Sequence, residues 1–132
     1  MAINFHPKPG MVLMCNFSGN VPPEIGKTRP VVIVTPAHVR RRELATAVPL
    51  STKPPHVIYA YHHRLVSAAY PGAAQEVWAK CDLVTSVSYA RLDRIHLSSG
   101  EQVIGYVSHQ DLISICYAVN AYFGIDPAPF RE

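Results

Sequence analysis

The chain has 132 residues, enough for one domain with a single hydrophobic core and too few for two domains of ordinary size. Hydrophobic residues make up 48% of it and charged residues 16%, which excludes a disordered chain. It does not open with a basic segment followed by an apolar one, and no apolar run approaches the roughly 20 residues of a membrane helix. We therefore expect a single domain over residues 1–132, a cytoplasmic location and no membrane partner.

The net charge of +3 is unevenly distributed. Residues 27–64 contain seven Lys and Arg residues and one acidic residue, whereas residues 65–132 contain four basic and seven acidic residues. A basic half on a small domain is typical of a nucleic-acid-binding protein, because neutralising phosphates supplies most of the sequence-independent affinity. A solvated basic surface would have the same composition, so the charge alone leaves both interpretations open.

Short β-strands dominate the predicted secondary structure. The 12 prolines favour strands and loops over helices. Apolar and β-branched runs bounded by Pro, Gly or charged residues predict the strands. They lie at residues 11–17, 30–35, 44–50, 57–64 and 91–97, with residues 76–87 forming either a strand pair or one long bent strand. Residues 18–27 are predicted to be an irregular loop, long enough to act as a flap.

One helix is predicted, near the end of the chain. Ser108, followed three residues later by Asp111, has the spacing of a capping box with Asp in place of the usual Glu. Several short strands followed by one amphipathic helix predict a small twisted barrel or sheet with the helix packed across it. The expected apolar face of the helix ends before Gly124 and consists of Leu112, Ile115, Cys116, Val119 and Phe123.

Sequence motifs for several enzyme classes are missing. The chain has no Gly-x-Ser-x-Gly, no Walker loop, no paired-cysteine zinc spacing and no His-Glu-x-x-His. His62 and His63 are neighbours on a predicted strand and should face opposite sides, so they are not expected to share a metal. Cys15, Cys81 and Cys116 are odd in number and widely spaced in apolar surroundings, which predicts buried free thiols. We expect neither a metal nor a cofactor.

The candidate site begins in the stretch from residue 24 to residue 36. Pro30 opens a buried strand and restricts the residue before it, so Arg29 is held in an extended conformation at the mouth of the strand. A guanidinium oriented in this way suits a phosphate or a carboxylate. Ser51 and Thr52 directly follow the next predicted strand. If the two strands are neighbours in the sheet, the charge and the hydroxyls converge at one edge.

Arg40, Arg41 and Arg42 form a basic cluster on a predicted connection between strands. Three exposed arginines would increase the rate of RNA association without fixing its geometry. We assign them an accessory role in RNA binding, with a solvated turn as the alternative.

Several of these segments resemble the MazF/PemK family of toxins. The specific ones are Lys27-Thr28-Arg29-Pro30-Val31-Val32-Ile33-Val34 and Val48-Pro49-Leu50-Ser51-Thr52, whose motifs occur in the order and spacing of the family. Pro9-Gly10-Met11-Val12-Leu13, Val84-Thr85-Ser86-Val87 and Arg91-Leu92 are weaker matches. The resemblance runs from about Pro9 to Phe123, and Trp78-Ala79-Lys80-Cys81-Asp82 suggests the YifN-type branch of PemK-like proteins.

The resemblance implies a mainly β fold, a small SH3-like barrel of the MazF/CcdB/Kid type with a C-terminal helix. It also implies the toxin of a type II toxin-antitoxin system, acting as a metal-independent endoribonuclease on single-stranded RNA. In such enzymes the ribose 2′-hydroxyl attacks the neighbouring phosphate and leaves a 2′,3′-cyclic phosphate and a 5′-hydroxyl. The implied partners are single-stranded RNA, a second copy of the chain in a homodimer, and a cognate antitoxin.

By the same resemblance, Arg29 and Thr52 are the expected catalytic residues. The guanidinium can stabilise charge on the phosphorane, and the hydroxyl can donate to a non-bridging oxygen. Because the pKa of arginine is too high for an efficient base, Glu24 becomes the candidate base or orienting group. We assign direct RNA contacts to the residues that flank this pair, namely Lys27, Thr28, Ser51 and Lys53.

Two segments depart from the common family pattern. Residues 18–26 are proline-rich, and residues 54–76 form a longer stretch than a minimal member needs, so the cleavage sequence is not predicted. A CcdB-like inhibitor that binds RNA or a topoisomerase without catalysis is one alternative, favoured by exposed aromatic residues at the end of the C-terminal helix, where Tyr122 and Phe123 lie. A scaffolding domain is another, favoured if Arg29 forms an internal salt bridge.

Overall fold

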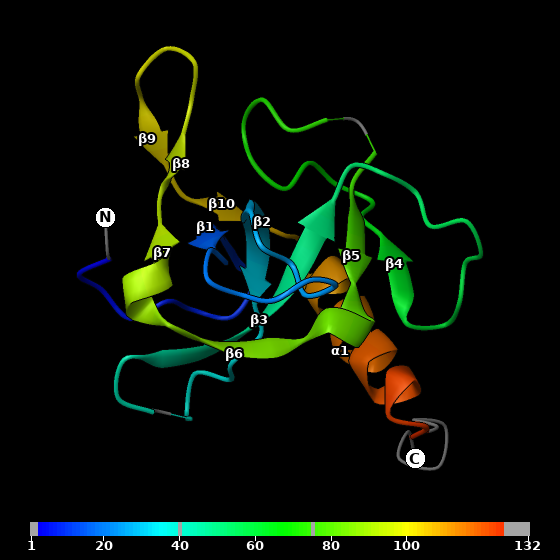
Figure 1. Cartoon of the computed structure of the whole chain (residues 1–132). Helices are drawn as coiled ribbons and strands as arrows, with labels where there is room; N and C mark the ends of the chain where they lie inside the picture. The colour runs from blue at the N-terminus through cyan, green and yellow to red at the C-terminus, as the bar shows by residue number, and fades with distance from the viewer. Residues whose placement is uncertain (1–2, 40, 75, 126–132) are drawn as a thin grey trace.

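The computed structural model describes residues 3–39, 41–74 and 76–125. Most of the regular structure is antiparallel β-sheet, and one helix, α1 (His109–Tyr122), follows the strands (Figure 1). Two short 3-10 helices occur at Cys81–Leu83 (η1) and Tyr89–Arg91 (η2). The strands are β1 (Met11–Asn16), β2 (Thr28–Ile33), β3 (Leu44–Ser51), β4 (His62–Arg64), β5 (Trp78–Lys80), β6 (Thr85–Ser88), β7 (Leu92–Asp93), β8 (Ile95–His96), β9 (Gln102–Val103) and β10 (Gly105–Tyr106).

The main sheet has the strand order β10-β1-β2-β3-β5-β4. In addition, β6 pairs with the first half of β3 and β7 pairs with β1, while β8 and β9 form a separate hairpin that projects from the body (Figure 1). The prediction of a mainly β fold with a C-terminal helix is confirmed. Within the described residues the sheet is not closed into a barrel, because β10 and β4 end the strand order without pairing with each other.

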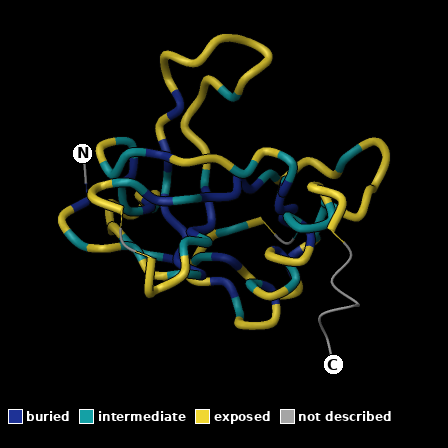
Figure 2. The backbone as a smooth tube through the Cα atoms, turned by 90° about the horizontal axis from the view of Figure 1, so that it is seen from below, coloured by how far each residue is buried: buried dark blue, intermediate teal, exposed yellow. Residues whose placement is uncertain are grey.

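Alternating burial along the central strands explains why these segments form strands. Side chains of successive residues point to opposite faces of a sheet, so a strand that is covered on both faces contributes to two cores. Val12 and Val32 belong to one cluster, which also contains Ile115 of α1, whereas Leu13 and Val31 belong to a second cluster on the other face. Figure 2 shows the buried segments in the middle of the molecule and the exposed loops around the rim.

The largest corrections to the predicted strands concern the second half of the chain. The strand expected at residues 57–64 covers only His62–Arg64, because its partner β5 is three residues long and offers no further pairing. The region at residues 76–87 is two strands, β5 and β6, separated by η1. The short strands β9 and β10 were not predicted, since two-residue strands have too little pattern to detect.

The helix begins as predicted, because the hydroxyl of Ser108 accepts a hydrogen bond of 3.0 Å from the backbone N–H of Asp111. Its buried side is shifted from the predicted apolar face. Asp111, Ile115 and Ala118 are the buried residues, whereas Cys116 and Phe123 are exposed. The prediction of a buried thiol is thus wrong for Cys116. In the described ranges, no helix is both long and apolar enough to cross a membrane.

The other two cysteines, Cys15 and Cys81, are buried and free, as predicted. Burial raises the pKa of Cys15 to about 11, against a smaller opposing effect of Arg91. Burial likewise raises the pKa of Cys81 to about 12, with Asp82 as a further cause. Both thiols therefore stay protonated at neutral pH and pack as small apolar groups.

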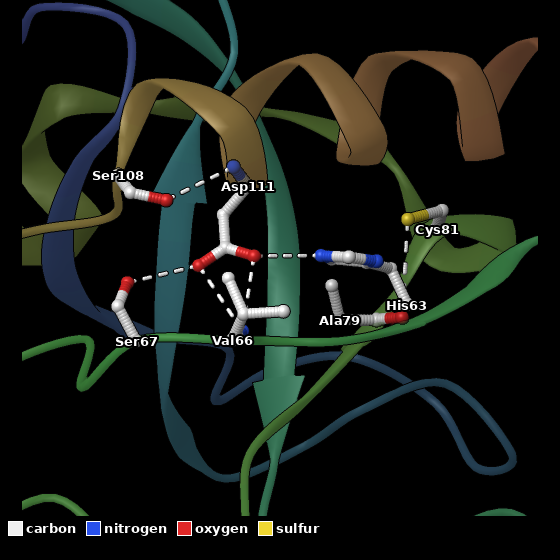
Figure 3. A network of polar contacts seen from close by, with 7 residues as sticks. All are labelled: His63, Val66, Ser67, Ala79, Cys81, Ser108 and Asp111. Carbon is white, nitrogen blue, oxygen red and sulfur yellow. Dashed lines mark hydrogen bonds and ion pairs between the residues drawn. The ribbon is translucent and has the colours of Figure 1, made fainter.

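A buried carboxylate joins the helix to the sheet (Figure 3). Asp111 has no solvent exposure, and its Oδ1 lies 2.8 Å from Nε2 of His63 on β4. The hydroxyl of Ser67 donates to Oδ2 at 3.0 Å, and the backbone N–H of Val66 donates to both oxygens. This set of partners compensates for the cost of burying the carboxylate and fixes residues 63–67 against the first turn of α1.

Burial tends to raise the pKa of Asp111, but the hydrogen bonds from His63, Val66 and Ser67 outweigh burial and lower it. Because this pKa is lower in the folded than in the unfolded chain, the carboxylate stabilises the fold fully above about pH 4. That stabilisation is lost as the pH falls through the folded-state pKa of Asp111.

We expect Asp111→Asn to lower the free energy of unfolding at pH 7 by about 3 kcal/mol, because it removes a charged acceptor from buried donors. The variant should also lose less stability than the parent protein between pH 5 and pH 2. Urea unfolding at several pH values measures both effects. Glu101→Gln, at an exposed position, is the control and should unfold like the parent; equal acid sensitivity of Asp111→Asn and the parent would contradict the assignment.

Candidate functional site

The structure brings Arg29 and the Ser51-Thr52 segment together at one end of the sheet. Strands β2 and β3 are antiparallel neighbours, with Val31 opposite Pro49. Continuing this register by two residues places Arg29 opposite Ser51, at the start of β2 and the end of β3. The sequence predicted that Arg29 and the hydroxyls of Ser51 and Thr52 would meet if these two strands were neighbours. The strands are neighbours, so this prediction is confirmed.

A hollow of about 160 Å³ lies at this end of the sheet, and we call it the Thr52 hollow. It contains four of the predicted site residues, which approach it from two strands and the turn after β3. That turn is held by a hydrogen bond of 3.1 Å from the backbone N–H of Lys53 to the hydroxyl oxygen of Ser51. The lining residues are Arg29, Pro30, Leu50, Ser51, Thr52, Lys53, Tyr70 and Val77.

The Arg29 side chain is exposed and forms no hydrogen bond or ion pair with any residue that the structure describes. The Thr52 side chain is also exposed, and its hydroxyl has no partner in the same set of residues. The internal salt bridge that would have favoured a scaffolding domain is thus not formed in the described part of the chain. A cation and a hydroxyl that face solvent across a small hollow are suited to bind an anion.

A second hollow, of about 310 Å³, lies beside the first, and we call it the His62 hollow. It shares Arg29, Leu50 and Ser51 with the Thr52 hollow. Its other lining residues are Ile25, Pro49, His62, Lys80, Asp82 and Leu83.

Polar groups of both signs line the His62 hollow. His62 and Lys80 are directly paired across β4 and β5, and Lys80 adds a second cation to Arg29. Oδ1 of Asp82 is buried without a hydrogen-bond partner among the described residues. The pKa of His62 is lowered, mainly by burial and to a smaller extent by the positive charge of Lys80, while the negative charge of Asp82 acts in the opposite direction. The imidazole is therefore neutral at pH 7.

The predicted flap at residues 18–27 is stiffened by its own hydrogen bonds. The carboxylate of Glu24 accepts a 2.7 Å hydrogen bond from the backbone N–H of Val21, and the backbone N–H of Glu24 donates to the carbonyl of Val21. The side-chain amide of Asn20 donates to the carbonyl of Ile25 at 2.8 Å. Glu24 does not line either hollow, whereas Ile25, the next residue, lines the His62 hollow.

Arg91 connects the start of this loop to the rest of the sheet. Its guanidinium donates to the backbone carbonyls of Asn16 and Ser18, at 2.8 and 3.1 Å. It also lines a wider hollow of about 820 Å³, together with Thr28 and Arg94. Thr28 thus lies near two cations on the side of β2 away from the His62 hollow.

The other predicted RNA contacts lie apart from the two hollows. Lys27 is exposed in the loop before β2 and lines neither hollow. Arg41 and Arg42 are exposed in the connection between the end of β2 and the start of β3, at the opposite end of these strands from Arg29 and Thr52 (Figure 1). Arg40 lies outside the described residues. The accessory role of the three arginines stays a prediction.

His62, Lys80 and Asp82 were not assigned to the site from the sequence. Their proximity to Arg29 depends on the pairing of β4, β5 and β3, which sequence periodicity does not specify. The opposed orientation of the two histidines is confirmed, since His63 contacts Asp111 whereas His62 lines the hollow. Within the described residues, no three His, Cys, Asp or Glu side chains are grouped so that they could hold a metal ion.

A family model described as PemK-like, MazF-like toxin of type II toxin-antitoxin system matches residues 8–123. The chain belongs to the PemK/MazF toxin family. The resemblance of the two segments around Arg29 and Thr52 is thereby confirmed at the level of the family, while the YifN-type branch stays a prediction. No curated protein matches the sequence.

Three solved structures, two of them MazF toxins, have a similar fold. MazF from Deinococcus radiodurans superposes with a TM-score of 0.70 at 18% identity, covering 92% of this chain and 100% of that one. An endoribonuclease in complex with its cognate antitoxin, from a Mycobacterial species, superposes with a TM-score of 0.62 at 17% identity, covering 92% of this chain and 98% of that one. Mycobacterium tuberculosis toxin MazF-mt6 superposes with a TM-score of 0.59 at 19% identity, covering 87% of this chain and 97% of that one. At these identities the likeness shows the fold alone.

We expect Arg91→Ala to release the loop at residues 18–27, because the substitution removes two hydrogen bonds of about 1 kcal/mol each. Amide hydrogen exchange of that loop should become roughly thirtyfold faster, with little change in the central strands. Arg94→Ala is a matched control, since the guanidinium of Arg94 lies over the ring of Phe5 instead. Equal exchange rates in the two variants would show that Arg91 does not anchor the loop.

Proposed function

We propose that this PemK/MazF toxin is an endoribonuclease that acts on single-stranded RNA in the cytoplasm, with Arg29 and Thr52 as its catalytic residues. One observation carries the proposal: the Arg29 guanidinium lies without a protein partner in the described residues, and it shares a solvent-open hollow with the Thr52 hydroxyl. An arginine unoccupied by a carboxylate is available for a phosphate, and its planar donors match two phosphate oxygens.

The proposed reaction is an attack of the ribose 2′-oxygen on the adjacent phosphorus. The 2′-hydroxyl loses its proton as it attacks, the bond between phosphorus and the 5′-oxygen breaks, and the departing 5′-oxygen gains a proton, which gives a 2′,3′-cyclic phosphate and a 5′-hydroxyl. Negative charge grows on the non-bridging oxygens as the phosphorane forms, and the Arg29 guanidinium and Thr52 hydroxyl donate to these oxygens. Lys53 and Lys80, which lie at the two hollows, add positive charge for the flanking phosphates.

Glu24 has two expected roles, a base for the 2′-hydroxyl and an orienting group. Its hydrogen bond to the Val21 N–H and its position outside both hollows favour the orienting role. In that role Glu24 stabilises the loop that carries Ile25 to the His62 hollow.

We also propose that the toxin forms a homodimer and binds a cognate antitoxin. A mostly apolar groove of about 500 Å³ lies between α1 and β6 and offers a surface for a second copy. It is lined by Val34, Val84, Cys116, Val119 and Phe123, among others. MazE-MazF from Deinococcus radiodurans is a solved complex of the same family, with a TM-score of 0.61 for its matched chain.

The CcdB-like alternative has one observation in its favour. Tyr122 and Phe123, at the end of α1, are 47% and 62% exposed, as expected for a contact surface on this helix. In that case the toxin would inhibit a topoisomerase without cleaving RNA. A DNA supercoiling assay with purified topoisomerase, run beside the RNA assay, distinguishes the two functions.

We expect the purified protein to cleave a labelled single-stranded RNA in the presence of EDTA and to leave cyclic-phosphate ends. Arg29→Ala should reduce the rate by about a hundredfold or more, because it removes the main donor to the phosphorane. Thr52→Val, which keeps the shape but not the hydroxyl, should lower the rate by about tenfold. Gel analysis and mass spectrometry of the products measure these effects.

Two outcomes of the cleavage assay would contradict the proposed function. One is a parent protein that gives no cyclic-phosphate product. The other is undiminished cleavage by Arg29→Ala. Lys8→Ala, which replaces an exposed cation that was not assigned to RNA binding, is a control for the loss of one positive charge.

Glu24→Gln tests the role of the loop carboxylate. The amide oxygen of Gln can still accept the hydrogen bond from Val21, whereas it cannot take a proton. We therefore expect Glu24→Gln to retain cleavage within about threefold, and Glu24→Ala to lose about fivefold because one loop hydrogen bond of about 1 kcal/mol is gone. A loss of activity in Glu24→Gln as large as that in Arg29→Ala would instead identify Glu24 as the base.

A further inference from the structure

Two tyrosine rings are stacked at the surface just before β4. The rings of Tyr59 and Tyr61 are 5.3 Å apart between centroids, with an angle of 11° between their planes. Tyr59 is 51% exposed, and it belongs to neither of the two hydrophobic clusters. A half-exposed ring held nearly parallel to another offers a flat π-face to a ligand.

Contacts on several sides hold this stack in place. His62 has its ring 4.5 Å from that of Tyr61, and its Nδ1 accepts a hydrogen bond of 3.1 Å from the backbone N–H of Tyr59. The backbone N–H of His62 donates in turn to the carbonyl of Tyr59 at 3.0 Å. Tyr122 of α1 meets Tyr61 edge to face at 5.4 Å. The stack is therefore preorganised, so that a ligand loses little of its binding energy in ordering it.

His62 connects the stack to the candidate catalytic residue. Its ring contacts both tyrosines, and it lines the same hollow as Arg29, Ser51 and Lys80. His62 thus links the tyrosine stack to the hollow that contains Arg29. Because Nδ1 of His62 accepts from the backbone, the neutral ring carries its proton on Nε2, which makes that atom a donor.

A flat aromatic stack beside cations and donors has the properties of a site for single-stranded nucleic acid. Every base has a π-face that can stack on a tyrosine, and the adjoining phosphate suits Arg29 or Lys80. An acidic peptide would satisfy the cations but would have no planar group to cover the rings.

We propose that Tyr59 and Tyr61 form a stacking platform for a base of the bound RNA, close to the phosphate that Arg29 contacts. This inference rests on the proposed function, because it takes single-stranded RNA as the ligand. It adds a binding subsite in residues 54–76, the stretch that is longer than a minimal family member needs.

The test measures RNA binding separately from cleavage. The probe is a single-stranded oligoribonucleotide with 2′-O-methyl groups, so that it lacks the attacking hydroxyl and is not cleaved. A set of such probes is used, each with a single 2-aminopurine at a different position. Fluorescence anisotropy of an end label gives the affinity. Quenching of 2-aminopurine reports stacking on an aromatic ring.

We expect Tyr59→Ala to weaken binding by about tenfold, as for the loss of one base-aromatic stack, and to abolish quenching at one probe position. Tyr59→Phe should bind like the parent, because the ring is kept. Tyr59→Leu keeps apolar bulk without a π-face and should behave like Tyr59→Ala. Tyr106→Ala is the matched control, since Tyr106 is 56% exposed on β10, at the other end of the strand order from β4.

The outcomes separate this inference from the proposed function. If the parent cleaves RNA but Tyr59→Ala binds the probe as tightly as Tyr106→Ala, the platform is wrong and the proposed ribonuclease function is supported. If the parent does not cleave RNA, yet RNA binding and 2-aminopurine quenching depend on the Tyr59 ring, the platform is supported and the proposed ribonuclease function is contradicted. Weaker binding of Tyr59→Ala to an acidic peptide, with its RNA binding unchanged, would also overturn the platform as an RNA subsite.

Discussion

The buried carboxylate of Asp111 determines how β4 is oriented. It accepts hydrogen bonds from His63 and from residues 66 and 67, and it has no solvent exposure. Because neighbouring residues on a strand face opposite sides, fixing His63 toward α1 directs His62 toward the hollow that contains Arg29. One interaction in the interior thereby sets the position of a polar group at the surface site.

The sequence was sufficient to predict the parts of the fold that depend on local pattern. The strands near residues 11–17, 30–35 and 44–50 and the Ser108 cap all depend on such patterns, and each was found within two residues of its predicted bounds. The convergence of Arg29 with Ser51 and Thr52 followed from the order of two adjacent strands. Its prediction needed only that these strands pair.

The remaining parts depend on contacts between distant residues. Asp111 has the pattern of a capping residue, and nothing local indicates that its carboxylate is buried against His63. The same holds for the exposure of Cys116, which follows from the rotation of α1 toward Asp111 and Ile115. His62 and Lys80 enter the site through the pairing of β4 with β5, and periodicity carries no information about which strands pair.

Prolines interrupt the central strands at the end of the sheet that carries the site. Pro30 lies on β2 opposite Met14, and Pro49 lies on β3 opposite Val31, and neither has a backbone N–H. Strands β2 and β3 are both inside the strand order, where proline is rare. The strand ends that carry Arg29 and Ser51 therefore offer two fewer backbone N–H donors than strands without proline would. This shortage of donors lies at the end of the sheet where a ligand would bind.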